Sequence, residues 1–247
     1  MNKINYRHTK EVHNSKDALE ILPLLFNYVS PKSIVDIGCG NGSWLEAAKS
    51  LGITKVQGVD GIKVDKEELL IQENEFLQHD LTKPLNLNKT FDLVISLEVA
   101  EHLPEVASNI FIETLCTHGD LILFSAAIPN QGGQFHLNEQ WPEYWHDKFK
   151  EYGFSAYDVI RNKIWNNENV FYWYKQNTIL YAKKGYFKGE EIEPSEIVNA
   201  LIHPDIYNRK IYHPKYIKNQ RELFKFIKST LKIYLKRWFG KYKISHL

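Results

Sequence analysis

The chain has 247 residues, 43% of them hydrophobic and 25% charged, so it can bury a substantial core and is too apolar to be largely disordered. Its two cysteines, Cys39 and Cys116, are too few for a disulfide framework or a multi-cysteine zinc site, which favours a reduced, cytoplasmic setting. We find neither the apolar core of a secretion signal nor a run of roughly 20 apolar residues, so we expect a soluble protein.

Apolar runs alternate with helical patterns along the chain, and this alternation predicts an α/β fold built on a mainly parallel sheet with helices on both faces. Helices are expected at 17–29, where Pro23 should kink or end the helix, and then at 43–52, 66–71, 105–119 and after the loop 129–145. A hairpin is expected at 168–177. Seven strands are expected, at 33–38, 55–60, 75–80, 91–97, 120–128, 155–160 and 178–183.

A glycine-rich turn joins the first expected strand to the next helix. In "VDIGCGNGSW", Gly38, Gly40 and Gly42 leave backbone free to approach a ligand, and the following helix points its N-terminus at the turn. The dinucleotide fingerprint G-x-G-x-x-G is absent, because Ser43 stands three residues after Gly40, and no Gly-Lys-Ser/Thr ending of a phosphate loop follows. The turn therefore indicates a nucleotide-type ligand without a pyrophosphate.

This turn, preceded by Asp36, resembles motif I of the class I S-adenosylmethionine-dependent methyltransferases, and the similarity extends over about 150 residues. The resemblance implies their Rossmann-like fold with a seven-stranded sheet and S-adenosylmethionine as cofactor. It further implies that Asp60 accepts hydrogen bonds from both ribose hydroxyls and that Asp80 accepts a hydrogen bond from the adenine amino group. The cofactor contacts implied in this way are Asp36, Gly38, Gly40, Gly42, Asp60, Gly61, Asp80, Leu81 and Ser96.

Ionisable side chains crowd the end of the fourth expected strand, in "SLEVAEHLP". If the chain turns helically there, Glu98, Glu101 and His102 project to one side, and His136 follows the neighbouring strand. Two carboxylates so close need a cation or a shared proton between them. The E-x-x-E-H pattern with a later histidine resembles metal-dependent small-RNA 2′-O-methyltransferases, and E-x-x-E-H alone is similar to the ubiquinone-pathway O-methyltransferases.

The resemblance implies that Glu98, Glu101, His102 and His136 bind a divalent ion such as Mg, Mn, Fe or Zn. Glu98, His102 and His136 are then the expected catalytic residues. Two alternatives stay open: His102 or His136 acts as a general base without a metal, or these side chains have only structural roles.

A polar and aromatic strip follows the fifth expected strand, and amides and rings of this kind recognise sugars or phosphorylated metabolites. Trp141 and Trp145 are four residues apart and fit equally well as core anchors of a helix. The expected substrate contacts are Gln131, Asn138, Glu139, Gln140, Trp141, Trp145, Trp173 and Gln176.

The string "SAAIPNQGGQFHLNEQWPEYW" with the later "YWYKQN" resembles bacterial methyltransferases found beside surface-polysaccharide genes, including those that methylate the phosphoramidate of capsules. We therefore expect an O-methyltransferase acting on a small carbohydrate-linked or phosphorylated acceptor. The alternatives are an RNA 2′-O-methyltransferase and an inactive methyltransferase fold that binds a membrane or a partner through its tail.

The tail differs from the rest of the chain in charge. Residues 215–247 hold ten basic residues and one acid, a net charge of +9, whereas the preceding residues carry a net charge of −8. A basic amphipathic helix is expected at 219–239, and it could pack on the domain or pair in a homodimer, lie on an anionic membrane, or bind nucleic acid. We rank these in that order, with nucleic acid unlikely because the acidic body disfavours it. The expected divisions are a helical segment at 1–30, a methyltransferase domain at 31–185 and a helical extension at 186–247.

Overall fold

The computed structural model describes residues 14–187, 192–211 and 219–238. The chain divides into two compact units, Met1–Leu201 and Ile202–Leu247. The first unit runs beyond the last strand because Ser195 returns to the sheet edge, where its N–H donates to the Ala156 carbonyl at 2.7 Å.

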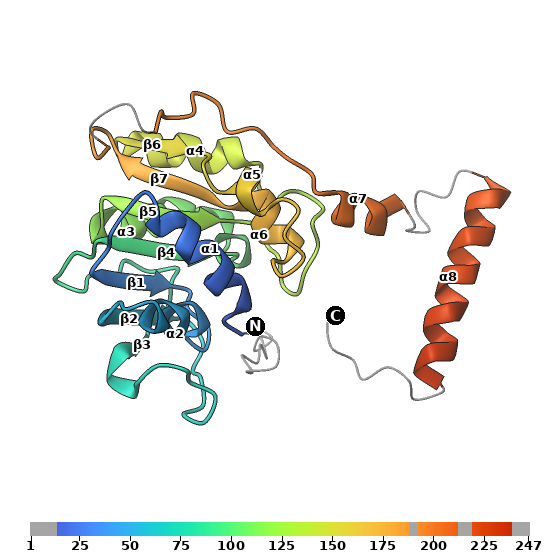
Figure 1. Cartoon of the computed structure of the whole chain (residues 1–247), viewed down its shortest axis with the longest axis horizontal. Coiled ribbons are helices and arrows are strands. Elements are labelled where there is room, and N and C mark those ends of the chain that lie inside the picture. Colours follow the sequence, from blue (N-terminus) through green and yellow to red (C-terminus); the bar gives the residue numbers. More distant parts are fainter. Residues whose placement is uncertain (1–13, 188–191, 212–218, 239–247) are drawn as a thin grey trace. The chain divides into compact units, whose positions relative to one another are not determined.

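One seven-stranded sheet forms the centre of the first unit, in the order β3-β2-β1-β4-β5-β7-β6 (Figure 1). All neighbouring strands are parallel except β7, which is antiparallel to both β5 and β6. The strands are β1 (Ser33–Ile37), β2 (Lys55–Asp60), β3 (Phe76–Gln78), β4 (Leu93–Leu97), β5 (Leu121–Ser125), β6 (Phe154–Tyr157) and β7 (Ile179–Lys183).

The chain moves outward from β1 to β2 and β3, then returns to place β4 on the other side of β1. The strand order therefore reverses between β1 and β4, and in open α/β sheets ligands bind at the carboxyl ends of the strands at such a point. The glycine turn and the E-x-x-E-H segment follow these two strands directly, so the topology brings them to the same edge.

Alternate residues of the central strands enter two separate cores, one on each face of the sheet. Leu93 and Ile95 of β4 face one core, and Val94 between them faces the other. The first core is covered by α1 (Lys16–Phe26), α2 (Ser43–Ser50), α5 (Arg161–Ile164) and α6 (Tyr172–Asn177). The second is covered by α3 (Ser108–His118) and α4 (Pro142–Glu151). The expected α/β fold with helices on both faces is confirmed.

Two local expectations were wrong. Residues 66–71 form turns and bends instead of a helix, and only the short 3₁₀ helix Glu73–Glu75 precedes β3. Residues 168–177 contain α6 instead of a hairpin. Pro23 lies inside α1, so the helix does not end there and continues to Phe26. Leu69 and Ile71 pack on the first core without helical backbone, and the Ile71 side chain lies next to Gly42 and Gly58.

The second unit contains α7 (Pro204–Ile211) and α8 (Gln220–Trp238). The amphipathic helix expected at 219–239 corresponds to α8. None of the helices in the described ranges combines the length and the apolar character needed to cross a membrane.

Asp17 ties α1 to the segment before α6 and is a buried ionisable group of the first core. Its Oδ1 accepts the Phe171 N–H at 2.7 Å. Burial raises the pKa of Asp17 from 3.8 to about 6, although this hydrogen bond acts in the opposite direction. A folded-state pKa above the unfolded value means that the folded protein binds the proton more tightly, so stability falls as pH rises from 4 through 6.

We therefore predict that Asp17→Asn, which is neutral at every pH and keeps an oxygen acceptor, gains stability relative to wild type as pH rises from 4 to 7. The gain should approach about 3 kcal/mol, because two pKa units correspond to roughly that free energy. Urea unfolding at several pH values measures it, with exposed Asp120→Asn as the control. A pH-independent difference between Asp17→Asn and wild type would contradict this assignment.

Candidate active site

The glycine turn after β1 has a backbone that other residues rarely adopt. Gly38, Gly40 and Gly42 have φ values of 93°, 54° and 86°. A Cβ atom built on Gly38 would lie 2.3 Å from a methyl group of Val99, which belongs to the segment after β4. The turn is thus packed directly against the E-x-x-E-H segment.

Two buried carboxylates lie behind this turn. Asp60, at the end of β2, accepts the Gly40 N–H at 2.8 Å through Oδ2 and the Ile62 N–H at 2.8 Å through Oδ1. Asp36 is buried near the end of β1, and burial together with the nearby Asp60 carboxylate raises the pKa of Asp36 well above its ordinary value. Asp60 therefore fixes the backbone of the turn, and both of its carboxylate oxygens are hydrogen-bonded.

The other expected cofactor residues surround the same strand ends. Asp80 is exposed after β3, where hydrogen bonds from the Thr82 hydroxyl and N–H lower the pKa of its carboxyl. Leu81 beside it is buried, and Gly61 follows Asp60 on the surface. Ser96 is fully buried in β4, and its hydroxyl donates to the Ile37 carbonyl at 2.8 Å, so it ties β4 to β1.

Three side chains with metal-ligating atoms meet at the end of β4. Glu101 and His102 lie in a short 3₁₀ helix (Ala100–His102), and His136 comes from the loop after β5. One ligand atom from each lies within 4.8 Å of the others, and the two imidazole rings meet edge to face with centroids 4.9 Å apart. Figure 1 shows the strands that carry them, β4 and β5, side by side.

The main chain of Glu101 holds the loop that carries His136. Its carbonyl accepts the N–H groups of Leu137 and Asn138, at 2.7 and 3.0 Å. The Asn138 side chain is buried and donates to the Ser108 hydroxyl at the start of α3. The residue after His136 is therefore fastened to the residue before His102.

Glu139 orients the His136 ring. Its Oε1 accepts from His136 Nδ1 at 2.8 Å and from the Gly132 N–H at 2.8 Å, and its Oε2 accepts the Asn130 N–H at 2.7 Å. A carboxylate can only accept here, so Nδ1 carries the proton and Nε2 of a neutral His136 keeps its lone pair. The Glu139 carboxylate thus holds together the two ends of the loop 130–139.

Glu98 does not join the group of ligating atoms, contrary to our expectation of one helical turn. Its φ of 55° is left-handed, and the helical turn begins only at Ala100. Its carboxylate instead accepts from Gln131 Nε2 at 2.8 Å and Asn177 Nδ2 at 3.0 Å. Burial raises the pKa of Glu98, and these amide donors partly offset that effect.

The Glu101 carboxylate is the least satisfied group of the site. It is fully buried, and neither oxygen has a hydrogen-bond partner of full geometry, although the backbone N–H groups of Glu101 and Ala127 and the Glu98 carboxylate lie close to it. Burial, with the Glu98 carboxylate nearby, raises the pKa of Glu101 well above its ordinary value. A buried, weakly hydrogen-bonded carboxylate beside two imidazoles is a donor set that a divalent cation would satisfy, so these three residues fit such an ion.

The expected substrate residues lie in several different surroundings. Trp145 belongs to the second core between Phe124 and Tyr144, so the core interpretation of this residue holds. Asn138, Glu139 and Gln140 hold the loop in place, since the Gln140 side chain donates to Asn138. Gln176 donates to Gln131 in the amide network around Glu98, and Trp173 stacks on Phe171.

Trp141 remains exposed at 44% on the outer end of the loop, and Phe135, which we had not singled out, is exposed at 48%. Asn177, which ends the segment expected to form a hairpin, completes the amide network with a bond to Gln131 at 2.9 Å. For Phe135, the position next to His136 in the sequence was the available signal.

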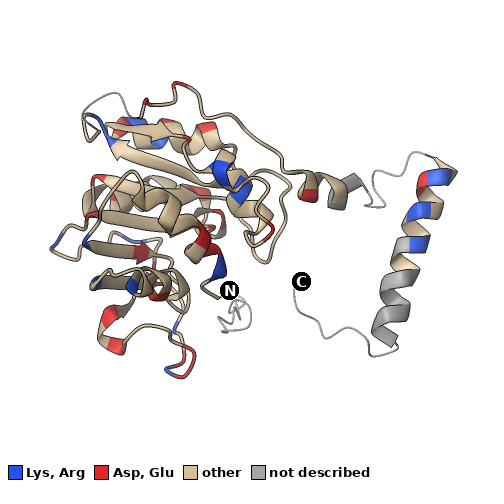
Figure 2. Ribbon diagram, in the orientation of Figure 1, with Lys and Arg blue, Asp and Glu red and all other residues tan. Residues whose placement is uncertain are grey.

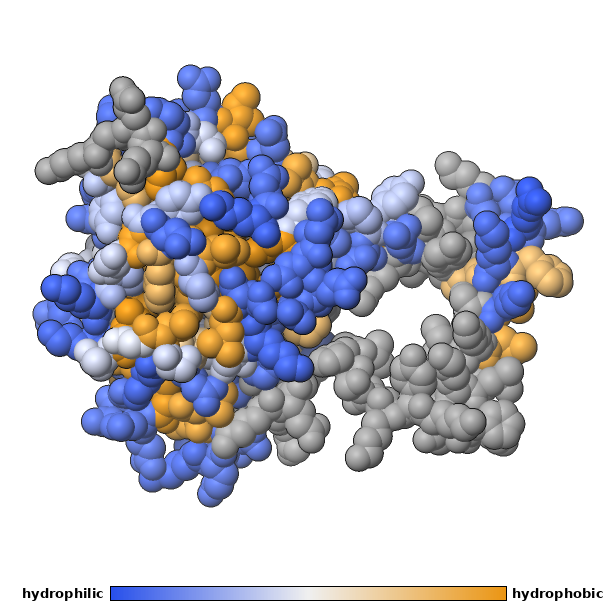
Figure 3. Space-filling view, viewed as in Figure 1, coloured by the Kyte–Doolittle hydropathy of each residue, from blue (hydrophilic) through white to orange (hydrophobic). Residues whose placement is uncertain are grey.

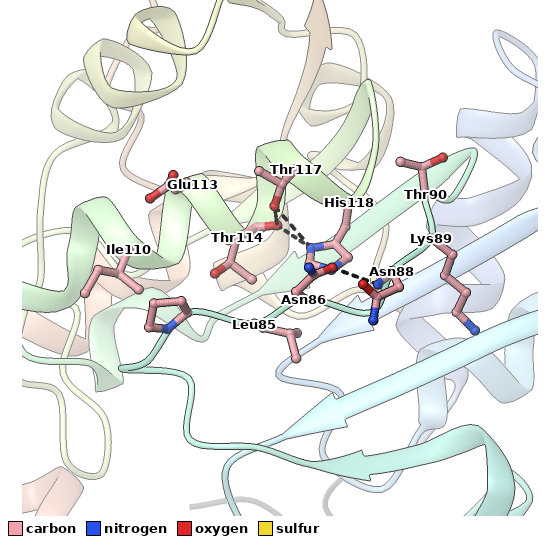
Figure 4. Close-up of a pocket in the computed structure, with 11 residues that line it drawn as sticks. Leu85, Asn86, Asn88, Lys89, Thr90, Ile110, Glu113, Thr114, Thr117 and His118 are labelled. Atoms are coloured by element: carbon pink, nitrogen blue, oxygen red, sulfur yellow. Dashed lines mark hydrogen bonds between the residues drawn. The ribbon is translucent and has the colours of Figure 1, made fainter.

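A separate cleft of about 620 Å³ lies between α3 and the loop before β4. Figure 4 shows its one histidine, His118, beside Thr114, whose carbonyl accepts from Nδ1 at 2.7 Å. Nε2 of His118 accepts the Leu87 N–H at 3.1 Å. The cleft is at the opposite end of β4 from Glu101, and its histidine has a structural role.

Comparison with known proteins fits this geometry. A family model described as a methyltransferase domain matches residues 8–162. The chain belongs to this methyltransferase family. The seven-stranded sheet with helices on both faces is the fold expected for a class I methyltransferase.

Individual relatives of the methyltransferase domain are distant. The ubiquinone biosynthesis O-methyltransferase of Haemophilus ducreyi is 31% identical over 127 residues, which cover 43% of this chain and 52% of that protein. The ribosomal protein L11 methyltransferase of Fusobacterium nucleatum is 28% identical over 145 residues, 55% of this chain and 42% of that protein. The chain thus spans about half the length of these relatives.

Among solved structures, Streptomyces venezuelae DesVI superposes with a TM-score of 0.50 and 10% identity, over 68% of this chain and 92% of that one. At that identity it supports the fold alone.

The contact between Gly38 and Val99 predicts the cost of adding one methyl group. Gly38→Ala should lose about 1–3 kcal/mol more stability than Gly52→Ala in urea unfolding, because overpacking adds to the strain of positive φ. Gly52 is the matched control, with a φ of 98° and nothing within 4 Å of its Cβ position. Equal losses in the two variants would show that Val99 does not close the turn.

Removal of the Glu139 carboxylate should change the tautomer of His136. Wild type should show neutral His136 protonated at Nδ1 in long-range proton–nitrogen correlation spectra, whereas Glu139→Ala should shift it toward the Nε2-protonated form that dominates in free imidazole side chains. Glu143→Ala on the exposed face of α4 is the control. An unchanged tautomer in Glu139→Ala would remove Glu139 from this role.

Proposed function

We propose that this protein is an S-adenosylmethionine-dependent O-methyltransferase that modifies a small carbohydrate-linked or phosphorylated acceptor with the help of a divalent cation. One observation carries the proposal. The glycine turn after β1 and the Glu101–His102–His136 group after β4 adjoin each other through the contact of Gly38 with Val99. A cofactor held by the turn and an acceptor held by the group would therefore meet in one crevice.

The cofactor side is built from main chain and carboxylates. Asp60 ends β2 beside the turn, where its carboxylate would face the ribose hydroxyls, and the exposed Asp80 can accept from an adenine amino group. The positive-φ backbone of Gly40 suits close approach by the amino-acid end of the cofactor. S-adenosylmethionine, when bound, supplies a methyl group activated by a positively charged sulfur.

On the acceptor side, Glu101, His102 and His136 would hold the cation. The two imidazoles favour Mn, Fe or Zn over Mg, which prefers oxygen ligands. The ion would supply Lewis acidity that lowers the pKa of an acceptor hydroxyl. Glu139 keeps the lone pair of His136 Nε2 available, and the buried carboxylates of Glu98 and Glu101 set the charge of the pocket.

The acceptor class rests on the loop after β5. Exposed Phe135 and Trp141 flank the polar segment with His136, an arrangement suited to stacking on a ring that carries hydroxyl groups. The similarity of this loop to surface-polysaccharide methyltransferases, including those acting on capsule phosphoramidate, favours such an acceptor. The names of the ubiquinone O-methyltransferase relatives support oxygen as the acceptor atom.

The test uses the full chain stripped of metal. We expect one S-adenosylmethionine bound per chain by calorimetry, and labelled methyl transfer to a sugar nucleotide or phosphorylated metabolite after Mn²⁺, Fe²⁺ or Zn²⁺ is restored. Glu101→Gln and His136→Ala should weaken cation binding about 10–100-fold or more, whereas exposed Glu105→Gln should not. Cation affinity should rise with pH, because the raised pKa of Glu101 means that a proton must leave before the ion binds.

Each arm of the test has its own contrary outcome. Absence of S-adenosylmethionine binding would favour an inactive fold. Full turnover in chelator, lost in His136→Ala, would make His136 a general base without a metal. Transfer to small RNA in preference to the metabolites would support the RNA alternative, which the net charge of −8 before residue 215 disfavours.

A further inference from the structure

The helix α8 separates basic and apolar residues onto opposite sides. At about 100° per residue, its basic positions other than Arg237 fall within an arc of about 80°. These are Arg221, Lys225, Lys228, Lys232 and Lys236. Figure 2 shows blue segments repeating along the described part of α8 and one red segment near its start, where Glu222 is the only acid.

Most of the remaining side of α8 is apolar, although Thr230 and Arg237 also fall on it. Its apolar positions span an arc of about 200°, much broader than the narrow seam of a two-helix coiled coil. They are Leu223, Phe224, Phe226, Ile227, Leu231, Ile233, Tyr234, Leu235 and Trp238. Four of them are exposed, Leu223 at 44%, Phe224 at 76%, Ile227 at 50% and Leu231 at 58%, and Figure 3 shows orange and blue surface adjoining on this helix.

We infer that α8 binds the surface of an anionic lipid bilayer, with its apolar side in the interface and its basic side toward the headgroups. A wide apolar arc with aromatic residues, a lysine-rich polar side and a modest total hydrophobicity distinguish a surface helix from a coiled-coil or spanning one. The charge of the tail complements such a surface, since residues 215–247 carry +9.

Residues 1–214 are acidic, so electrostatic attraction to an anionic membrane cannot come from the whole chain. Residues 1–214 carry −8 and would be repelled by an anionic surface, so attraction has to come from the tail. The attraction should weaken in salt, whereas the contribution of the apolar side should not. Both contributions can therefore be measured separately.

The experiment is sedimentation of the full chain with lipid vesicles. We expect binding to phosphatidylcholine vesicles that contain phosphatidylglycerol and about tenfold weaker binding to phosphatidylcholine alone, with high salt reducing the difference. Lys225→Glu/Lys228→Glu should reduce anionic-vesicle binding about tenfold or more. The matched control is Lys32→Glu/Lys55→Glu, which makes the same change in net charge at exposed lysines of the first unit.

Phe224→Ser/Leu231→Ser should reduce binding at both low and high salt, because it removes exposed apolar side chains and leaves the charge unchanged. The inference is overturned if wild type fails to sediment with anionic vesicles, or if the control pair loses as much binding as the α8 pair. It is also overturned if the α8 substitutions only dissociate a homodimer in light scattering, or only abolish binding to duplex RNA, with vesicle binding unchanged.

Discussion

The candidate active site depends on two hydrogen bonds that the carbonyl oxygen of Glu101 accepts from the N–H groups of Leu137 and Asn138. These bonds hold His136, in the loop after β5, next to Glu101 and His102 at the end of β4. Glu101 also contributes a buried carboxylate without a hydrogen-bond partner of full geometry. Position and chemistry thus come from one residue, and a change in its backbone would disperse the ligand group.

The sheet topology places these ligands next to the glycine turn. Because β4 pairs with β1, the segment after β4 packs against the glycine turn after β1, and Gly38 leaves room for Val99 at the point of contact. Elsewhere in a protein, three such ligands would suit many metal sites. Next to a glycine turn fixed by Asp60, they suit transfer of a group from a bound nucleoside to an acceptor.

The sequence predicted the parts of the site that follow from periodicity and strand ends. The acids Asp36, Asp60 and Asp80 lie at successive strand ends as expected, since parallel strands place their carboxyl ends at one edge. Glu98 could not be placed from spacing, because its left-handed backbone breaks the assumed turn and amides from Gln131 and Asn177 hold its carboxylate. Those amides are 33 and 79 residues away, beyond any local pattern. The turns at 66–71 and α6 within 168–177 likewise depend on tertiary packing over the sheet.

The most direct test is a crystal structure of the full chain with S-adenosylhomocysteine and Mn²⁺, with anomalous scattering used to locate the manganese. The account predicts one manganese peak within bonding distance of Glu101, His102 and His136, and the thioether sulfur beside the Gly38–Gly42 turn in the same crevice. A manganese peak elsewhere, no peak at saturating Mn²⁺, or a crevice closed to the nucleoside would contradict it.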